Sequence, residues 1–360
     1  MPEALLSGLF RTQSCVPGPA GAKEGPNLNG CGSRMLLVTG GAGFIGSNVV
    51  AALNEAGQTD VAVCDFLGSD AKWRNLAKRR LADAVAPADL PAWLNGRKLD
   101  AVIHMGAISD TTATDADAVI ENNFRLSLRL LDWCTAARVP FIYASSAATY
   151  GDGNAGFDDD WSPEALARLK PMNLYGWSKQ AFDLAVVDRA VKKEKLPPQW
   201  AGLKFFNVFG PNEYHKGEMM SLVAKRFDDV KAGRTVRLFK SHRPGIEDGD
   251  QRRDFIYVDD AVAVVRWLMQ TPAVSGIFNV GTGKARSFRD LIASVFRALG
   301  REPDIEYVDM PESIRGQYQY FTEAKVDNLR RAGYNAGFTA LEDAVRRYVT
   351  QFLDTADRYR

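Results

Sequence analysis

Thr39-Gly40-Gly41-Ala42-Gly43-Phe44-Ile45-Gly46 follows directly on the apolar run 36–39 and opens a segment of helical periodicity. Small residues between a buried strand and a helix let the backbone approach a pyrophosphate, which the free N–H groups at the helix N-terminus then hold. Asp65 ends the next apolar run, nineteen residues beyond Gly46, where an acidic side chain accepts a hydrogen bond from an adenosine ribose. This spacing predicts a dinucleotide-binding site rather than a tight turn alone.

Short apolar runs alternate along the chain with segments of helical spacing. We expect strands over 36–39, 61–64, 101–105, 141–144 and 203–206, and helices over 44–56, 119–137 and 173–193. The runs are continuously hydrophobic, which is typical of strands covered on both faces and hence of a parallel sheet. The pattern predicts an α/β fold with a Rossmann-type doubly wound parallel sheet.

The second half of the chain is more irregular. We expect a helix over 219–232, strands over 253–258 and 277–280, and a helix capped by Ser287 with Asp290 three positions on. These elements predict a smaller α/β substrate domain interleaved with the first. The expected division is a disordered tail at 1–34, a dinucleotide-binding domain at 35–206 plus about 256–282, and a substrate domain at 207–255 plus 283–360.

Composition narrows the class of protein. The 360 residues hold 45 Lys+Arg against 44 Asp+Glu, a net charge of +1, which argues against a nucleic-acid binder or a basic membrane-surface protein. No apolar stretch reaches the roughly 18–20 residues that a membrane span needs. The four cysteines and three histidines are scattered, which argues against a metal site and favours a reducing, cytoplasmic location.

The first 34 residues differ from the rest. They are rich in Gly and Pro, and their apolar run 5–10 comes after Glu3 and is too short for a secretory signal. We expect the natural start at Met35, with a transit peptide as the alternative.

Tyr175 and Lys179 are four residues apart at the start of an expected helix, so they share one face. Bringing a phenol from a pKa of ~10 to ~7 takes about 4 kcal/mol, which an adjacent ammonium and a nicotinamide cation can share. Tyr175 is then a candidate acid/base, and Ser146, beyond the strand 141–144, a candidate partner for a reacting hydroxyl. The alternatives are a core aromatic, an exposed lysine and a polar strand terminus.

Three basic residues are further candidates. Lys216 follows the strand end near 207–212 and either faces the same site or is a solvated loop lysine. Arg253 either clamps a diphosphate or pairs with Asp254 or Asp259. Lys72 would neutralise the extra phosphate of NADP, whereas Asp65 favours NAD.

Six stretches together are similar to one known group of enzymes. They are TGGAGFIGSN at 39–48, ASSAATYG at 144–151, NLYGWSK at 173–179, FFNVFGPNEYHKG at 205–217, RDFIYVDD at 253–260 and GIFNVGTGKARSF at 276–288. The chain resembles the extended short-chain dehydrogenase/reductase superfamily that acts on nucleotide sugars. HKG at 215–217 and the stretch 316–334 point, within it, to epimerases of an ADP-linked heptose.

That resemblance implies an isomerase of lipopolysaccharide core biosynthesis. The C6 hydroxyl of the ADP-heptose substrate is oxidised by tightly bound NADP, with NAD possible, and the same hydride returns to the other face. Tyr175 and Lys216 fall on the family's acid/base positions, Ser146 assists, and Lys179 holds the nicotinamide ribose. The resemblance also implies a homo-oligomer, a pentamer, and neither nucleic acid nor membrane as partner.

The resemblance extends to the binding residues. The cofactor-contact positions are Gly40, Gly43, Phe44, Ile45, Gly46, Asp65, Phe66, Lys72, Met105, Gly106, Ala107, Ile108, Ser109, Asn122, Lys179, Val208 and Lys216. The substrate-contact positions are Ser146, Asn207, Glu218, Lys225, Phe239, Lys240, Ser241, Arg253 and Tyr318. The sequence departs from the family pattern at Phe66, Pro87 and Glu218, and 243–250 is an insertion near the sugar-nucleotide site.

Other functions stay open at this point. The first alternative is another nucleotide-sugar epimerase or reductase of the same superfamily. A 4,6-dehydratase is disfavoured because Ala147-Ala148-Thr149 replaces the Asp-Glu pair that such an elimination uses. A nicotinamide-sensing protein without turnover has no need for Tyr175, Lys179 and Lys216 together.

Overall fold

The structure, a computed structural model, describes residues 35–315 and 318–360. The expected tail at 1–34 and the start of the stretch 316–334 therefore lie outside the described residues. The central element is a seven-stranded sheet in the order β10-β6-β5-β4-β1-β2-β3, in which every neighbouring pair is parallel. Its strands are β1 (Leu36–Thr39), β2 (Val61–Cys64), β3 (Asp83–Val85), β4 (Ala101–His104), β5 (Phe141–Ser146), β6 (Trp200–Phe205) and β10 (Gly276–Val280). The expected fold class is confirmed.

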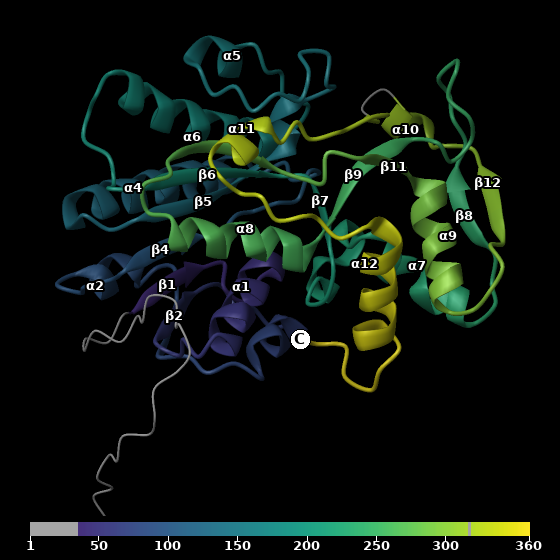
Figure 1. The fold of residues 1–360 in the computed structure, drawn as a ribbon, viewed down its shortest axis with the longest axis horizontal. Helices are drawn as coiled ribbons and strands as arrows, with labels where there is room; N and C mark the ends of the chain where they lie inside the picture. The colour runs from purple at the N-terminus through teal and green to yellow at the C-terminus, as the bar shows by residue number, and fades with distance from the viewer. Residues whose placement is uncertain (1–34, 316–317) are drawn as a thin grey trace, which may run out of the picture. The chain divides into compact units, whose positions relative to one another are not determined.

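Both faces of this sheet are covered by helices, as Figure 1 shows. Successive side chains of a strand point to opposite faces. Accordingly Leu36 and Val38 join the cluster that contains α1 (Phe44–Glu55) and α8 (Val258–Gln270). Leu37 joins the cluster of α4 (Leu126–Ala137) and α6 (Leu174–Val191). The continuous hydrophobicity of β1 thus serves two separate cores.

The remaining helical elements are mostly short. They are α2 (Leu90–Leu94), α3 (Ala116–Ile120), α5 (Pro163–Ala167), α7 (Leu222–Lys231), α9 (Phe288–Ala298), α10 (Glu312–Arg315), α11 (Asp327–Arg331) and α12 (Leu341–Tyr348), the 3-10 turns η1 (Ala71–Leu76), η3 (Ala147–Tyr150) and η4 (Tyr214–Met219), and the π-helical turns η2 (Glu121–Arg125) and η5 (Val349–Leu353). The capping box expected at Ser287 and Asp290 is present at the start of α9.

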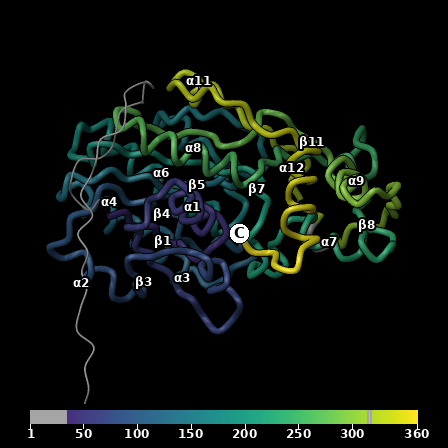
Figure 2. The backbone as a smooth tube through the Cα atoms, turned by 60° about the horizontal axis from the view of Figure 1, so that its bottom comes forward, coloured from purple at the N-terminus to yellow at the C-terminus, as the bar shows by residue number. Residues whose placement is uncertain are grey.

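The chain also forms two smaller sheets, whose strands lie partly before and partly after β10 in the sequence. One has the order β11-β9-β7, with β7 (Asn207–Phe209), β9 (Arg252–Tyr257) and β11 (Ala285–Ser287), and the other pairs β12 (Ile305–Val308) with β8 (Val236–Phe239). Figures 1 and 2 agree that β8, α7 and α9 lie at one end of the described chain and α2 at the other. The hydrophobic cluster of β1 and α1 continues into α7 and α9. The seven-stranded sheet and the elements around the smaller sheets therefore share one hydrophobic core.

Most sequence-based boundaries agree with the structure to within one or two residues, and four differences affect the description of the fold. The expected helix 119–137 is divided by the π turn η2, and the helix expected from 219 begins at Leu222 after η4. The strand expected at 203–206 starts at Trp200, and the strand expected at 141–144 continues through Ser146. Within the described residues no helix is long and apolar enough to cross a membrane, and no group of His, Cys, Asp or Glu is arranged to hold a metal ion.

Candidate active site

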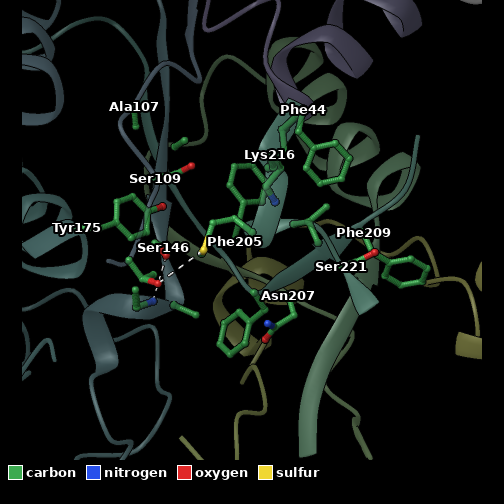
Figure 3. A pocket seen from close by; sticks show the side chains of 18 of the residues that line it. Phe44, Ala107, Ser109, Ser146, Tyr175, Phe205, Asn207, Phe209, Lys216 and Ser221 are labelled. Carbon is green, nitrogen blue, oxygen red and sulfur yellow. Dashed lines mark hydrogen bonds between the residues drawn. The ribbon is translucent and has the colours of Figure 1, made fainter. Parts of the chain in front are cut away.

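A cavity of about 590 Å³ opens at the carboxyl ends of the parallel strands. Its walls include Gly40 after β1, Asp65 after β2, Met105 after β4, Ser146 at the end of β5 and Asn207 after β6. Doubly wound folds bind ligands at this edge, because the loops that follow parallel strands converge there. Figure 3 shows Tyr175 beside Ser146 on one side of the cavity, with Lys216 and Phe44 across from them.

The glycine loop between β1 and α1 is closely packed. Gly40 has φ +64°, and a Cβ on it would lie 2.5 Å from the Gly106 nitrogen. A Cβ on Gly46 would lie 2.1 Å from the Gly40 carbonyl oxygen. Helix α1 begins after Gly43 with no side-chain cap, so the N–H groups of its first turn face the cavity unshielded. This is the cradle that a pyrophosphate requires.

Asp65, at the end of β2, has hydrogen-bond partners within the protein for both of its carboxylate oxygens. One carboxylate oxygen accepts a hydrogen bond from the Ala42 amide at 2.9 Å, and the other pairs with the Lys72 ammonium at 2.6 Å. Lys72 also donates to the Phe66 carbonyl at 2.9 Å. Lys72 is therefore an ordered partner of Asp65, whereas the Phe66 side chain is 61% exposed and does not line the cavity.

The loop after β4 is held by Asn123, a residue that the sequence analysis missed. Its side-chain oxygen accepts from the Ile108 amide at 2.8 Å, and its amide nitrogen donates to the Ile108 carbonyl at 2.9 Å and to Ser178 at 3.0 Å. Asn122 instead donates to the Ala118 carbonyl in the preceding helix α3. No sequence motif marks Asn123, which is the buried residue of the π turn η2.

Tyr175 reaches the cavity because of how α6 begins. Asn173 caps the helix by accepting from the Gly176 amide at 2.8 Å, and a Cβ on Gly176 would lie 2.6 Å from the Ala148 carbonyl oxygen. This close packing brings Tyr175 to Ser146. Burial raises the pKa of Tyr175, and a hydrogen bond from Ser146 opposes that shift.

Lys179 lies one turn further along α6 and is buried. Its ammonium donates to the Ala144 carbonyl at 2.9 Å. Burial lowers the pKa of Lys179 to about 8, with the charge of Asp183 acting in the opposite direction. The alternative of an exposed surface lysine is wrong.

Lys216 sits on the opposite wall, with its amine 5.0 Å from the centroid of the Phe44 ring. Burial lowers the pKa of Lys216, and the buried Glu213 opposes this effect. Glu213 accepts from the Ser221 amide at 2.6 Å and the Ser221 hydroxyl at 2.7 Å, which closes the loop that carries Lys216. The alternative of a solvated loop lysine is wrong.

The residues expected to contact substrate are divided between two places. Ser146 and Asn207 line the cavity. Arg253 adjoins it: its guanidinium lies 5.5 Å from the ring centroids of both Phe288, which lines the cavity, and Tyr318. Of its expected acidic partners, Asp254 accepts from Thr282 and Gly283, and Asp259 pairs with Arg360. Within the described residues Arg253 has no ion pair, so that alternative is wrong.

Other expected positions lie outside the cavity wall. Phe239 packs edge-on against Tyr318, Lys240 lies 3.6 Å from Asp309, and Glu218 pairs with Lys225. The predicted residues that do line the cavity are Gly40, Gly43, Phe44, Ile45, Gly46, Asp65, Lys72, Met105, Gly106, Ala107, Ser109, Ser146, Tyr175, Lys179, Asn207, Val208 and Lys216, and those that do not are Phe66, Ile108, Asn122, Glu218, Lys225, Phe239, Lys240, Ser241, Arg253 and Tyr318.

These features define a class of protein: a dinucleotide-dependent enzyme with a doubly wound sheet, whose cavity presents a phenol and an amine beside the glycine loop. Residues 36–281 match the NAD dependent epimerase/dehydratase family. The chain belongs to that family, and its cofactor is a nicotinamide dinucleotide, for which the uncapped start of α1 and the ordered Asp65 are suited.

Named relatives agree with this assignment. The chain is 52% identical over 334 residues to the ADP-L-glycero-D-manno-heptose-6-epimerase of Nitratidesulfovibrio vulgaris strain DP4, covering 90% of this chain and 100% of that one. It is 46% identical over 335 residues to the enzyme of the same name from Fusobacterium nucleatum, with coverages of 90% and 100%. The crystal structure of that epimerase from Helicobacter pylori is 27% identical, with a TM-score of 0.71 and coverages of 89% and 96%. The resemblance drawn from the motifs is confirmed.

Proposed function

We propose that the protein interconverts ADP-D-glycero-D-manno-heptose and ADP-L-glycero-D-manno-heptose by transient oxidation and re-reduction at C6. The observation that carries the proposal is the placement of Tyr175 and Lys216 on opposite sides of one cavity beside the glycine loop. A single carbon that loses and regains hydrogen on two faces requires a proton-transferring group on each side. The names of the relatives supply the sugar.

Tyr175 is the group on the first side. Its phenolate would take the proton of the C6 hydroxyl as the C–H bond breaks, while Ser146 donates to the same oxygen and orients it. In the chain alone, burial raises the pKa of Tyr175, so ionisation needs additional positive charge. When bound, the nicotinamide dinucleotide supplies that charge and the hydride-accepting and hydride-donating chemistry.

Lys216 is the group on the second side. After the sugar turns in the cavity, the Lys216 ammonium would give the proton that the C6 oxygen needs as the alcohol re-forms with inverted configuration. The lowered pKa of Lys216 suits this exchange, because a less basic amine gives up its proton more readily. The Phe44 ring and Glu213 hold the amine in place.

We further propose NADP rather than NAD as the cofactor. The Lys72 ammonium neutralises Asp65 at 2.6 Å, which removes the repulsion that a carboxylate would exert on a 2′-phosphate. Mass spectrometry of the cofactor released by denaturing the purified protein tests this: the mass of NADP supports the proposal, and the mass of NAD refutes it.

The remaining expectations stay part of the proposal. The diphosphate and sugar would be surrounded by Arg253, Lys225, Lys240, Ser241, Phe239, Tyr318, Glu218 and Asn207. The cofactor would also contact Phe66, Ile108 and Asn122. The protein would work in the cytoplasm as a homo-oligomer of five chains, with one dinucleotide-binding and one substrate domain in each chain. Sedimentation at several concentrations tests the assembly.

The decisive experiment supplies purified holoenzyme with ADP-D-glycero-D-manno-heptose and follows the C6 configuration by NMR. We expect an equilibrium mixture of both C6 epimers without net change in the cofactor's redox state. No change at C6, with turnover of a different nucleotide sugar, would favour another epimerase or reductase of the family. Net accumulation of reduced cofactor would also contradict the proposal.

A further inference from the structure

A buried ion pair lies against β5 near the end of the strand that carries Ser146. The Lys204 ammonium on β6 lies 2.9 Å from the Asp183 carboxylate on α6, and their side chains are 1% and 0% exposed. Lys204 also donates to the Thr149 hydroxyl at 2.7 Å, which in turn donates to the Ser146 carbonyl at 2.8 Å. The pair is thus connected to the backbone of a candidate catalytic residue.

Asp183 completes a row of functional side chains on one face of α6. Tyr175, Lys179 and Asp183 are spaced four residues apart, so they lie one above another along the helix. Lys179 donates to the Ala144 carbonyl at 2.9 Å, and Ser145 and Tyr143 donate to Asp183 at 2.7 and 3.1 Å. Three consecutive residues of β5 therefore hold the row in register.

We propose that Asp183 is a positioning residue for Lys179: its carboxylate, fixed by Lys204, Ser145 and Tyr143, keeps the buried Lys179 ammonium charged and aimed at the cofactor site. The role of Lys179 toward the cofactor rests on the proposed function, whereas the effect of Asp183 on the charge of Lys179 does not. An isolated ammonium in an apolar interior tends to lose its proton, and Asp183 is a buried carboxylate four residues from Lys179 on the same helix.

The other titratable groups around Lys179 cannot replace Asp183. His104 on β4 is fully buried, and burial together with the Lys179 charge lowers its pKa to about 3, so it stays neutral. Tyr143 and Tyr150 have pKa values raised by burial and by nearby carboxylates, and burial also raises the pKa of Tyr175. The remaining charge is Lys204, which has the same sign as Lys179.

The charge of Lys204 limits the effect of the Asp183 carboxylate on the pKa values of neighbouring groups. Asp183 alone would raise the pKa of Tyr175 as well as that of Lys179, which would oppose formation of the phenolate. The Lys204 ammonium, paired with Asp183 at 2.9 Å, reduces both effects. It follows that removing the pair and removing Lys204 alone shift the pKa of Lys179 in opposite directions.

The test uses the full chain with its cofactor bound and ¹³C,¹⁵N-labelled lysine, and titrates the Lys179 side chain by NMR. The signal is assigned by its absence in Lys179→Arg. We compare wild type with the double variant Asp183→Asn/Lys204→Met, which removes both buried charges, and with Lys204→Met alone. The control is Arg189→Met/Asp132→Asn, which removes a 2.6 Å ion pair between α6 and α4, neither member of which lines the cavity.

We expect the pKa of Lys179 to fall by about one pH unit in the double variant, a tenfold change in its charged-to-neutral ratio, and to rise in Lys204→Met. The basic limb of the kcat profile should move with it, and the control should leave both unchanged. An unchanged Lys179 pKa in either folded variant would overturn the proposal, and either one suffices if the other does not fold. Because the titration needs no turnover, an inactive wild type would refute only the proposed function.

Discussion

Gly46→Ala is the sharpest test of the glycine loop. The added Cβ would stand 2.1 Å from the Gly40 carbonyl oxygen, whereas real Cβ atoms essentially never approach a neighbour within 3.0 Å. Because the Gly40 carbonyl is a backbone group and cannot rotate away like a side chain, α1 and the glycine loop must move apart by about 1 Å. Overpacking of this kind costs about 1–3 kcal/mol. In a chain of this size we expect Tm without cofactor to fall by roughly 1–4 °C.

The same substitution should weaken the cofactor. The N–H groups that would hold the pyrophosphate belong to the displaced turn, so the rise in Tm on adding NADP or NAD should shrink. Gly337→Ala is the matched control, because a Cβ there meets nothing within 4 Å, and we expect its Tm to stay the same or to rise slightly. Differential scanning fluorimetry with and without cofactor measures both effects. A Gly46→Ala protein with the wild-type Tm and the wild-type cofactor response would refute the reasoning.

Three further predictions concern the rest of the site and its surroundings. Tyr175→Phe and Lys216→Met should each slow epimerisation by roughly 10²–10⁴-fold while cofactor stays bound, as read by NMR and absorbance; full turnover in both would exclude the two-sided assignment. Asn123→Ala leaves the Ile108 backbone unpaired and should lower the free energy of unfolding by about 1–3 kcal/mol in urea. Asp159 is buried with its pKa raised to about 6, so the folded state binds its proton more tightly and stability falls as pH rises toward 6. Asp159→Asn should therefore stabilise the protein at pH 7 by about 1–3 kcal/mol and have no effect below pH 4; a gain that persists at low pH would contradict this.

The sequence predicts the parts of the fold that depend on neighbours in the chain. The run 36–39, the glycine loop and α1 are contiguous, and their pattern alone determines strand, turn and helix. The spacing of Tyr175 and Lys179 likewise needs only helical geometry. The short strands β8 and β12 have no such signal, because each is stabilised by the other across more than sixty intervening residues.

The same distinction applies to the site. The strand end near 207–212 and the family resemblance both make Lys216 a candidate, but its contact with Phe44 and its dependence on Glu213 follow only from tertiary packing. Arg253 was predicted to bind either a diphosphate or an acid, whereas the structure places it between two rings. The Asp183–Lys204 pair joins a helix to a strand through a sheet register, which no local spacing encodes.

Because of the π turn η2, the number of residues in its helical segment determines the direction in which the Asn123 side chain points. A π turn is an α-helical turn widened by one residue, and here it carries Asn123 toward the loop after β4. Deleting Glu121 or Asn122 would restore regular winding and shift Asn123 by one helical position, a rotation of about 100° away from Ile108. Homologues and designed variants should therefore tolerate exchanges of side chains along this segment far better than insertions or deletions.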